Sequence, residues 1–214
     1  MLLSAEKKII AHQLRDFHQW HRGIAYYGFW CLMIDNPGWQ QAVAQAQAHL
    51  SSFLHSGYRR QPHLTLFPCG LLDARFFSDE MLTRQADALA TARLSPLRLE
   101  LPGHLDSFTT APHLPVTDHD GGLAKIRATL TAVSPEDSPT ARYHPHITLG
   151  FYRDAFAIDR IAAHLHAFRV PPLSWTARSV CFCRFATANT QGPLEILARL
   201  EIPDVITGCT HPSS

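Results

Sequence analysis

One short pattern occurs twice in this chain of 214 residues, and it constrains the fold more than any other feature. The two copies, Pro62-His63-Leu64-Thr65-Leu66 and Pro145-His146-Ile147-Thr148-Leu149, are separated by 83 residues. Each alternates polar and apolar residues, as a strand does when one of its faces lies in a core. The repeat therefore predicts two equivalent strands, one in each half of the chain.

The spacing inside each copy has a chemical consequence. Residues two apart on a strand project from the same face, so His63 lies beside Thr65, and His146 beside Thr148. If an approximate two-fold relates the two halves, two imidazoles and two hydroxyls face one central cleft. Two imidazoles with a pKa of about 6.5 can supply one base and one acid near neutral pH. With hydroxyls as donors to phosphoryl oxygens, this set suits attack on a phosphodiester without a metal ion. Which histidine is the base stays open.

Hydrophobic periodicity and turn residues divide the rest of the chain into helices and strands. The expected helices are residues 4–20, 36–54, 78–93, 118–132 and 158–168. The expected strands are residues 24–35, 61–69, 97–101, 107–115, 144–152, 174–185 and 194–202. This order is too irregular for a doubly wound sheet. We expect an α+β fold with two antiparallel or mixed sheets, each backed by helices.

The same pattern suggests how the chain is organised. We expect an N-terminal helix in residues 1–23, a single bilobal domain in 24–202 and a tail in 203–214. The two lobes are expected to meet near residues 102–107, where strands can exchange between them.

Composition excludes several classes of protein. Hydrophobic residues make up 46% and charged residues 17%, which excludes a disordered chain. A net charge of +1 does not suit binding to long nucleic acid. The apolar stretches are shorter than the roughly 20 residues of a membrane span, and the N-terminus lacks the order of a signal peptide. We expect a cytoplasmic monomer with no membrane partner, whose five cysteines are reduced thiols.

Basic and aromatic residues flank both motifs and are candidates for substrate binding. Arginine forms bidentate contacts with phosphate, and tyrosine can stack on a nucleobase. A solvated strand end or a core position is the alternative for each. The candidates are Arg59, Arg60, Arg142 and Arg153 for phosphate, and Tyr58, Tyr143 and Tyr152 for a base.

Metal binding is a competing interpretation. His144 and His146 form a His-x-His pair that could bind zinc on a strand, while His164 and His166 diverge on a helix. The neighbourhood offers no further ligands at obvious spacing, so we expect no metal and no cofactor. Cys181 and Cys183 share a strand face, and we expect a core role for them. The remaining histidines of interest are expected at or near the surface: His12, His18, His21 and His113.

At the two motifs the sequence resembles the two-histidine (2H) phosphoesterase superfamily, which includes 2′-5′ RNA ligase-like proteins and RNA 2′,3′-cyclic phosphodiesterases. The resemblance covers roughly residues 24–202. It implies a bilobal, pseudo-two-fold fold with a central cleft and a cyclic-phosphate or 2′-5′ substrate. Carried over residue by residue, it implies His63, Thr65, His146 and Thr148 as the catalytic residues.

Three functions are compatible with these residues. The first is metal-independent hydrolysis of a 2′,3′-cyclic phosphate on an RNA end or a small nucleotide. The second is 2′-5′ RNA ligation, or hydrolysis of 2′-5′ linked oligonucleotides. The third is a module that binds nucleotides without turnover. Because both motifs are intact, an enzyme is favoured over a binding module, and an RNA terminus or small nucleotide is the expected partner.

Overall fold

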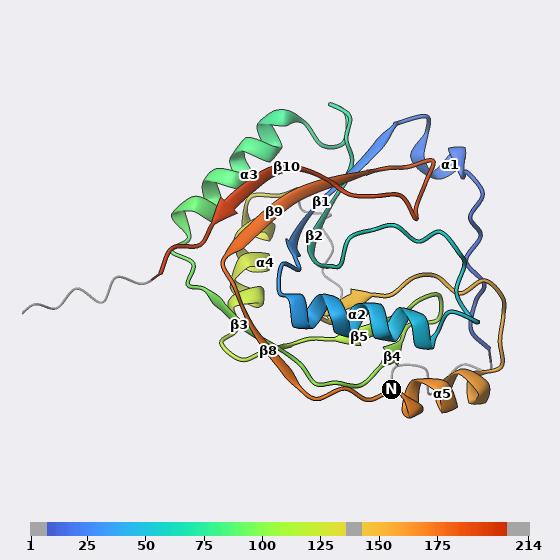
Figure 1. Cartoon of the computed structure of the whole chain (residues 1–214). Helices are drawn as coiled ribbons and strands as arrows, with labels where there is room; N and C mark the ends of the chain where they lie inside the picture. The colour runs from blue at the N-terminus through green and yellow to red at the C-terminus, as the bar shows by residue number, and fades with distance from the viewer. Residues whose placement is uncertain (1–7, 136–142, 205–214) are drawn as a thin grey trace, which may run out of the picture.

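Five helices and ten strands make up the regular structure of the residues that the computed structural model describes, 8–135 and 143–204 (Figure 1). The helices are α1 (His18–His21), α2 (Pro37–His49), α3 (Asp79–Thr91), α4 (Gly122–Ala132) and α5 (Ile158–Ala167). The strands are β1 (Tyr26–Met33), β2 (His63–Leu71), β3 (Leu97–Leu101), β4 (Asp106–Ser107), β5 (Pro112–Pro115), β6 (Thr117–Asp118), β7 (His146–Thr148), β8 (Leu173–Ala177), β9 (Ser179–Ala186) and β10 (Glu195–Glu201). Within these residues, no helix is both long and apolar enough to cross a bilayer.

The strands form two antiparallel sheets, which confirms the expected α+β class. The larger sheet has seven strands in the order β10-β9-β1-β2-β7-β5-β4, and the smaller has three in the order β6-β3-β8. The two motif strands, β2 and β7, are direct neighbours in the larger sheet. Strands from both halves of the chain intermix, since β9 and β10 lie beside β1, and β3 pairs with β8.

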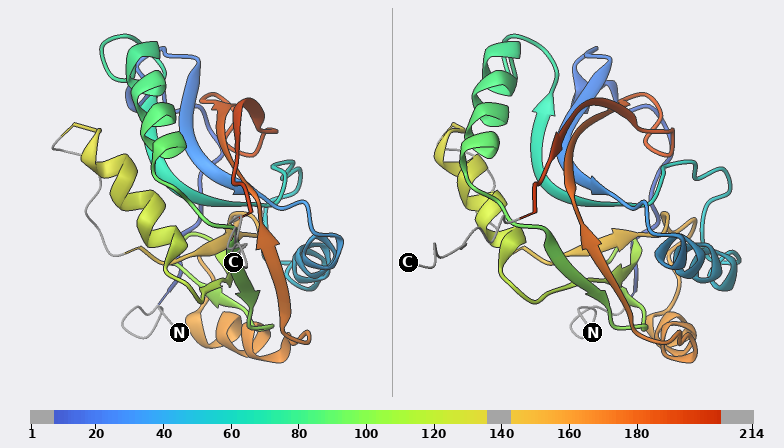
Figure 2. Two further views of the ribbon diagram at one scale, coloured as in Figure 1. Left: turned by 90° about the vertical axis from the view of Figure 1, so that its left-hand side faces the viewer. Right: turned by 60° about the vertical axis from the view of Figure 1, so that its left-hand side comes forward.

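Helices cover the outer sides of the sheets. Helices α3 and α4 lie side by side, and α2 and α5 lie away from this pair (Figure 2). Helix α2 begins as its sequence predicts, because the Asn36 side chain accepts a hydrogen bond from the Trp39 backbone N–H and Pro37 occupies the first turn. The main core includes side chains from α2, α4 and the motif strands, among them Trp39, Ile126 and Leu64. The helices thereby fix one face of the larger sheet.

The expected N-terminal helix is wrong within the described residues. Residues 8–17 contain no helix, and α1 has only four residues. The backbone N–H groups of this segment donate to distant carbonyls instead: Ile9 to Phe156 at 3.2 Å, and His12 to Tyr152 at 2.9 Å. Ile9 is also buried in the core. Contacts with the rest of the chain therefore override the helical periodicity of the segment.

Three expected strands are shorter or divided. The strand expected at 174–185 breaks at Arg178 into β8 and β9, which belong to different sheets. The strand expected at 107–115 is a hairpin of β4 and β5, closed by a bond from the Phe108 N–H to the Ala111 carbonyl. The strand expected at 144–152 contains only β7, and the chain leaves the sheet by Gly150, whose φ of 146° favours glycine.

Candidate active site

The four motif side chains lie on one face of the larger sheet. Strands β2 and β7 are antiparallel, with Leu64 paired to Ile147. In this register His63 lies opposite Thr148, and Thr65 opposite His146. We call the surface formed by these four side chains the motif face. Two equivalent motifs on antiparallel neighbours are related by an approximate local two-fold axis, so each histidine is a diagonal neighbour of the other.

The apolar residues of the motifs hold this register. Leu64 and Ile147 are fully buried in the main core, on the face opposite the motif face. A slip of one residue would turn these apolar side chains out of the core and the histidines into it. The alternation that marks each motif in the sequence is therefore also what fixes its position in the sheet.

The prolines help to orient the imidazoles. Nδ1 of His63 lies 2.8 Å from the Gln61 carbonyl, and Nδ1 of His146 lies 2.7 Å from the His144 carbonyl. Each acceptor belongs to the residue before a proline, which the proline ring restricts to extended conformations. Because a carbonyl only accepts, each Nδ1 carries its proton in the neutral ring. Nε2 is then free to take up a proton, and the protonated ring can give one up.

The two rings differ in their surroundings. Burial lowers the pKa of His63 to about 4, the bond to Gln61 opposes this shift, and the Arg60 guanidinium and His146 add to it. Burial also lowers the pKa of His146, less strongly. The effect of His146 on His63 shows that the two rings are close enough to interact. His63 is thus the more readily deprotonated of the pair.

A third histidine, His113, lies beside the motif face, and the sequence interpretation of it as a surface residue is wrong. It pairs with Thr148 across β5 and β7 and is 2% exposed. Its ring centroid lies 5.0 Å from that of His146, and it stacks on Phe108 at 4.3 Å. Phe108 also meets the His146 ring edge-on at 4.8 Å. Pairing between strands far apart in the sequence produces this cluster, so no local signal could have revealed it.

The buried histidines predict a loss of stability in mild acid. Burial lowers the pKa of His113 to about 3 and that of His63 to about 4, both well below 6.5. Below pH 6.5 these two histidines become protonated in the unfolded chain but stay neutral in the folded chain. The free energy of unfolding therefore falls as the pH falls. Between pH 7 and pH 5 we expect each of the two rings to lower the free energy of unfolding by about 2 kcal/mol.

The variant His113→Phe isolates one of these two contributions. Denaturant unfolding should be measured at pH 7 and at pH 5 for both proteins. Between these pH values the free energy of unfolding of His113→Phe should fall by about 2 kcal/mol less than that of the wild-type chain. Equal losses in the two proteins would show that His113 is not kept neutral by the fold.

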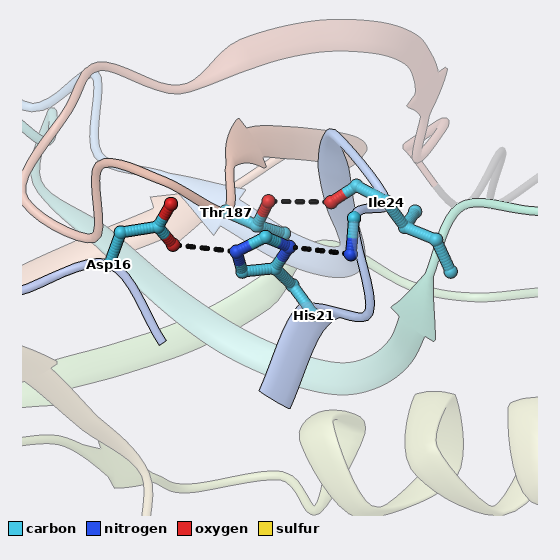
Figure 3. Close-up of polar contacts among 5 residues, drawn as sticks. Asp16, His21, Ile24 and Thr187 are labelled. Atoms are coloured by element: carbon cyan, nitrogen blue, oxygen red, sulfur yellow. Dashed lines mark hydrogen bonds and ion pairs between the residues drawn. The ribbon is translucent and has the colours of Figure 1, made fainter. Parts of the chain in front are cut away.

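His21 is also buried rather than exposed, but its role is structural. Its Nδ1 accepts from the Gly23 N–H at 3.1 Å, so its Nε2 donates to Asp16 Oδ1 at 2.6 Å (Figure 3). The Thr187 hydroxyl donates to the Ile24 carbonyl at 2.6 Å beside it. The two His21 bonds hold the turn before β1 together, and the Thr187 bond joins this turn to the end of β9. Of the other two histidines expected near the surface, His12 is half-buried and His18 is exposed.

Among the flanking candidates, Arg60 is the cation that faces the motif histidines. Its guanidinium lowers the pKa of His63 and lies 3.9 Å above the Phe185 ring. Its Nε is buried without a hydrogen-bond partner, and within residues 8–135 and 143–204 it has no acidic partner. Arg59, one residue earlier, is exposed. A half-buried guanidinium with unused donors can bind an anion.

None of the other flanking candidates within the described residues is placed to stack on a base or bind a phosphate at the motif face. Tyr152 is fully buried and its hydroxyl bonds to Ser107 at 2.8 Å, so its ring has no free face for a base. The Tyr143 hydroxyl donates to the Thr65 carbonyl, which braces β2. Arg153 and Tyr58 both line a cavity of about 450 Å³ that none of the four motif side chains lines. Arg142 lies outside the described residues.

The His-x-His pair predicted as a possible zinc site is not part of a larger cluster of metal ligands in the part of the chain that the structure describes. There, no group of three or more His, Cys, Asp or Glu side chains is arranged to hold a metal ion. Cys31, Cys69, Cys181 and Cys183 are free thiols, and Cys209 lies outside the described residues.

Comparisons with known proteins agree with this fold. The chain superimposes on TT0787 of Thermus thermophilus with a TM-score of 0.56 at 17% identity, covering 83% of this chain and 98% of that one. E. coli LigT complexed with 3′-AMP gives a TM-score of 0.51 at 18% identity, covering 84% of this chain and 99% of that one. A conserved protein of unknown function from Agrobacterium tumefaciens, ATU0111, gives a TM-score of 0.55 at 15% identity, covering 90% of this chain and 93% of that one. No curated protein sequence gives a significant match.

A family model supplies the sequence-level relationship. It is described as the 2′-5′ RNA ligase superfamily and matches residues 35–189, a span that contains both motifs and most of both sheets. The resemblance seen in the two motifs is thereby confirmed: this chain belongs to the 2′-5′ RNA ligase superfamily of 2H phosphoesterases.

Proposed function

We propose that this protein is a metal-independent phosphodiesterase that hydrolyses a 2′,3′-cyclic phosphate on an RNA end or a small nucleotide. The observation that carries the proposal is the pairing of two His-x-Thr motifs on adjacent antiparallel strands, with both imidazoles held through Nδ1. Membership of a phosphoesterase and ligase superfamily supports action on a phosphodiester bond.

The difference in pKa between the two histidines supports a division of roles between them. His63 has its pKa lowered to about 4 and is neutral at pH 7, so its Nε2 takes the proton from an attacking water. The pKa of His146 is lowered less strongly, so in the reactive form of the protein His146 would be the ring that carries a proton on Nε2, and it would donate this proton to the ribose oxygen that leaves phosphorus. The P–O bond to the water forms as the P–O bond to the ribose breaks. In this mechanism the diagonal arrangement of His63 and His146 would allow the base and the acid to approach the phosphoryl group from opposite sides.

The threonines and Arg60 act on the charge of the phosphoryl oxygens. Neither threonine hydroxyl has a hydrogen-bond partner among the described residues, and both side chains are partly exposed on the motif face. They can donate to the two non-bridging oxygens, while the Arg60 guanidinium offsets their negative charge. Such donors stabilise the transition state most because they are already in place before the reaction begins.

Nucleotide ligands of similar folds support the choice of substrate. Solved structures of E. coli LigT include complexes with 3′-AMP, NADP+ and ATP. Each ligand joins a phosphate to a nucleoside. A phosphate between His63 and His146 would place such a nucleoside along the motif face of this chain.

A small panel of substrates tests the proposal. The protein is incubated with 2′,3′-cyclic nucleotides, a cyclic-phosphate-ended RNA oligomer and a 2′-5′ linked dimer, each with and without EDTA, and the products are separated by chromatography. We expect the cyclic phosphates to open to monoesters at a rate that EDTA does not change. Cleavage of the 2′-5′ dimer or joined ends would favour the second function, and tight binding without turnover would favour a binding module.

Replacing the threonines tests the proposed donors. Thr65→Val and Thr148→Val keep the β-branched shape of the side chain and remove only the hydroxyl. We expect each to lower kcat about tenfold to a hundredfold, with a smaller effect on KM, because the bonds strengthen in the transition state. Thr176→Val, on the exposed side of β8 in the smaller sheet, is the matched control and should keep full activity. Full activity in both motif variants would remove the hydroxyls from the mechanism.

A further inference from the structure

Three sulfur atoms form a triangle beside the motif face. Cys31 Sγ lies 3.4 Å from Cys183 Sγ, and Met33 Sδ lies 3.8 Å from each of the two thiols. Cys31 and Met33 are on β1, and Cys183 is on the neighbouring strand β9. In the β1–β2 register Cys31 pairs with Thr65, and Met33 with His63, so the triangle lies on the same side of the sheet as the motifs. We call it the sulfur triangle.

The dimensions of the triangle match those of a metal site. At a metal–sulfur bond length of about 2.3 Å, three sulfurs in a plane around one ion lie about 4 Å apart. The observed separations would have to open by about 0.2 Å for the two that are 3.8 Å and by about 0.6 Å for the one that is 3.4 Å. Two thiolates and one thioether are soft ligands, which select Cu(I) among the biological metal ions.

The geometry fits a metal ion better than a disulfide between Cys31 and Cys183. Cys31 pairs directly with Cys181, so Cys183 is its diagonal neighbour. Diagonal residues in an antiparallel pair have Cα atoms about 7–8 Å apart, which exceeds the usual disulfide range of about 4.4–6.8 Å. An ion requires the two sulfurs to separate by about 0.6 Å, whereas a disulfide requires them to approach from 3.4 Å to about 2.05 Å.

The surroundings suit a monovalent ion. Phe29, Phe185 and Leu194 pack with the two cysteines in an apolar cluster, which disfavours strongly hydrated ions. The Arg199 guanidinium favours the thiolate of either cysteine. Met33 is only half-buried, so the third corner of the triangle is partly accessible to solvent.

We propose that Cys31, Cys183 and Met33 bind one Cu(I) ion in a three-coordinate site next to the motif histidines. On binding, each cysteine S–H bond breaks and gives its proton to solvent, while two copper–thiolate bonds and one copper–thioether bond form. Nothing is oxidised or reduced. Two thiolates and one Cu(I) leave a net charge of −1, which the nearby Arg199 offsets in part. The site does not depend on the proposed phosphodiesterase activity.

Titration with Cu(I) against a chromophoric chelator, under anaerobic conditions and with the full chain, tests the site. A Cys209→Ser background removes the thiol that lies outside the described residues. We expect one Cu(I) per chain, with X-ray absorption showing sulfur ligands at about 2.3 Å. Cys31→Ala and Cys183→Ala should each weaken binding at least a hundredfold, and Met33→Leu about tenfold.

Cys69→Ala is the matched control. Its thiol donates to Gln85 at 3.4 Å, away from the triangle, so binding should be unchanged. Met33→Leu preserves size and hydrophobicity and is expected to fold even where a cysteine variant does not. Binding that is unaffected by Met33→Leu, nitrogen or oxygen ligands in the absorption spectrum, or no binding by the folded wild-type chain would each overturn the proposal.

Discussion

His63→Ala and His146→Ala are each expected to lower kcat/KM for a 2′,3′-cyclic nucleotide by about a hundredfold to ten-thousandfold. Each substitution removes one of the two groups that we propose to move a proton, and no other side chain in the described part of the motif face repeats the Nδ1 bond that orients them. Initial rates measured on the purified variants, with and without EDTA, give the size of the loss.

His104→Ala is the control for this experiment, because His104 is an exposed histidine outside the motif strands. It should retain the wild-type rate. Thermal unfolding of all three variants separates loss of chemistry from loss of fold. If either motif variant is folded and fully active, the two-imidazole mechanism is wrong.

Arg60→Gln is expected to lower kcat/KM by about tenfold to a hundredfold, mainly through loss of a charge-assisted contact with the phosphoryl group. The neighbouring Arg59→Gln is a closely matched control: it makes the same change one residue away, on an exposed side chain. Comparing the two variants on one substrate distinguishes a site-directed guanidinium from a general effect of positive charge.

The same substitution has a signature in the pH profile. Burial is the main cause that lowers the pKa of His63 to about 4, and Arg60 adds to the effect. Removing Arg60 therefore raises the pKa of His63. Because the base must be deprotonated, the acidic limb of kcat/KM should move to higher pH in Arg60→Gln and stay in place in Arg59→Gln. An acidic limb that does not move would place Arg60 away from the base.

The features that could be predicted from the sequence are those set by residues close together in the chain, such as a helix start or the alternation within a strand. The Asn36-Pro37 start of α2 is visible because a cap and a first-turn proline act within one helical turn. The alternation in each motif predicted strands with polar residues on one face, and β2 and β7 have this arrangement. The strand expected at 97–101 coincides with β3 because its apolar residues alternate cleanly.

The N-terminal segment shows where local pattern fails. Its apolar spacing fits a helix, but in residues 8–17 the backbone bonds to carbonyls near positions 109, 152 and 156. No local pattern reports such partners. The break at Arg178 is similar, since two β-rich segments without a strong turn signal join different sheets.

The sequence by itself determined the chemistry available: two imidazoles, two hydroxyls and the apolar residues that point them away from the core. Only the tertiary structure decided how these groups meet, because pairing of β2 with β7 depends on contacts between residues 83 positions apart. The same long-range pairing brought His113 against His146, turned Arg60 rather than Arg153 toward His63, and buried Tyr152. Burial and proximity set the proton affinities at this site, and both arise only when the sheet is assembled.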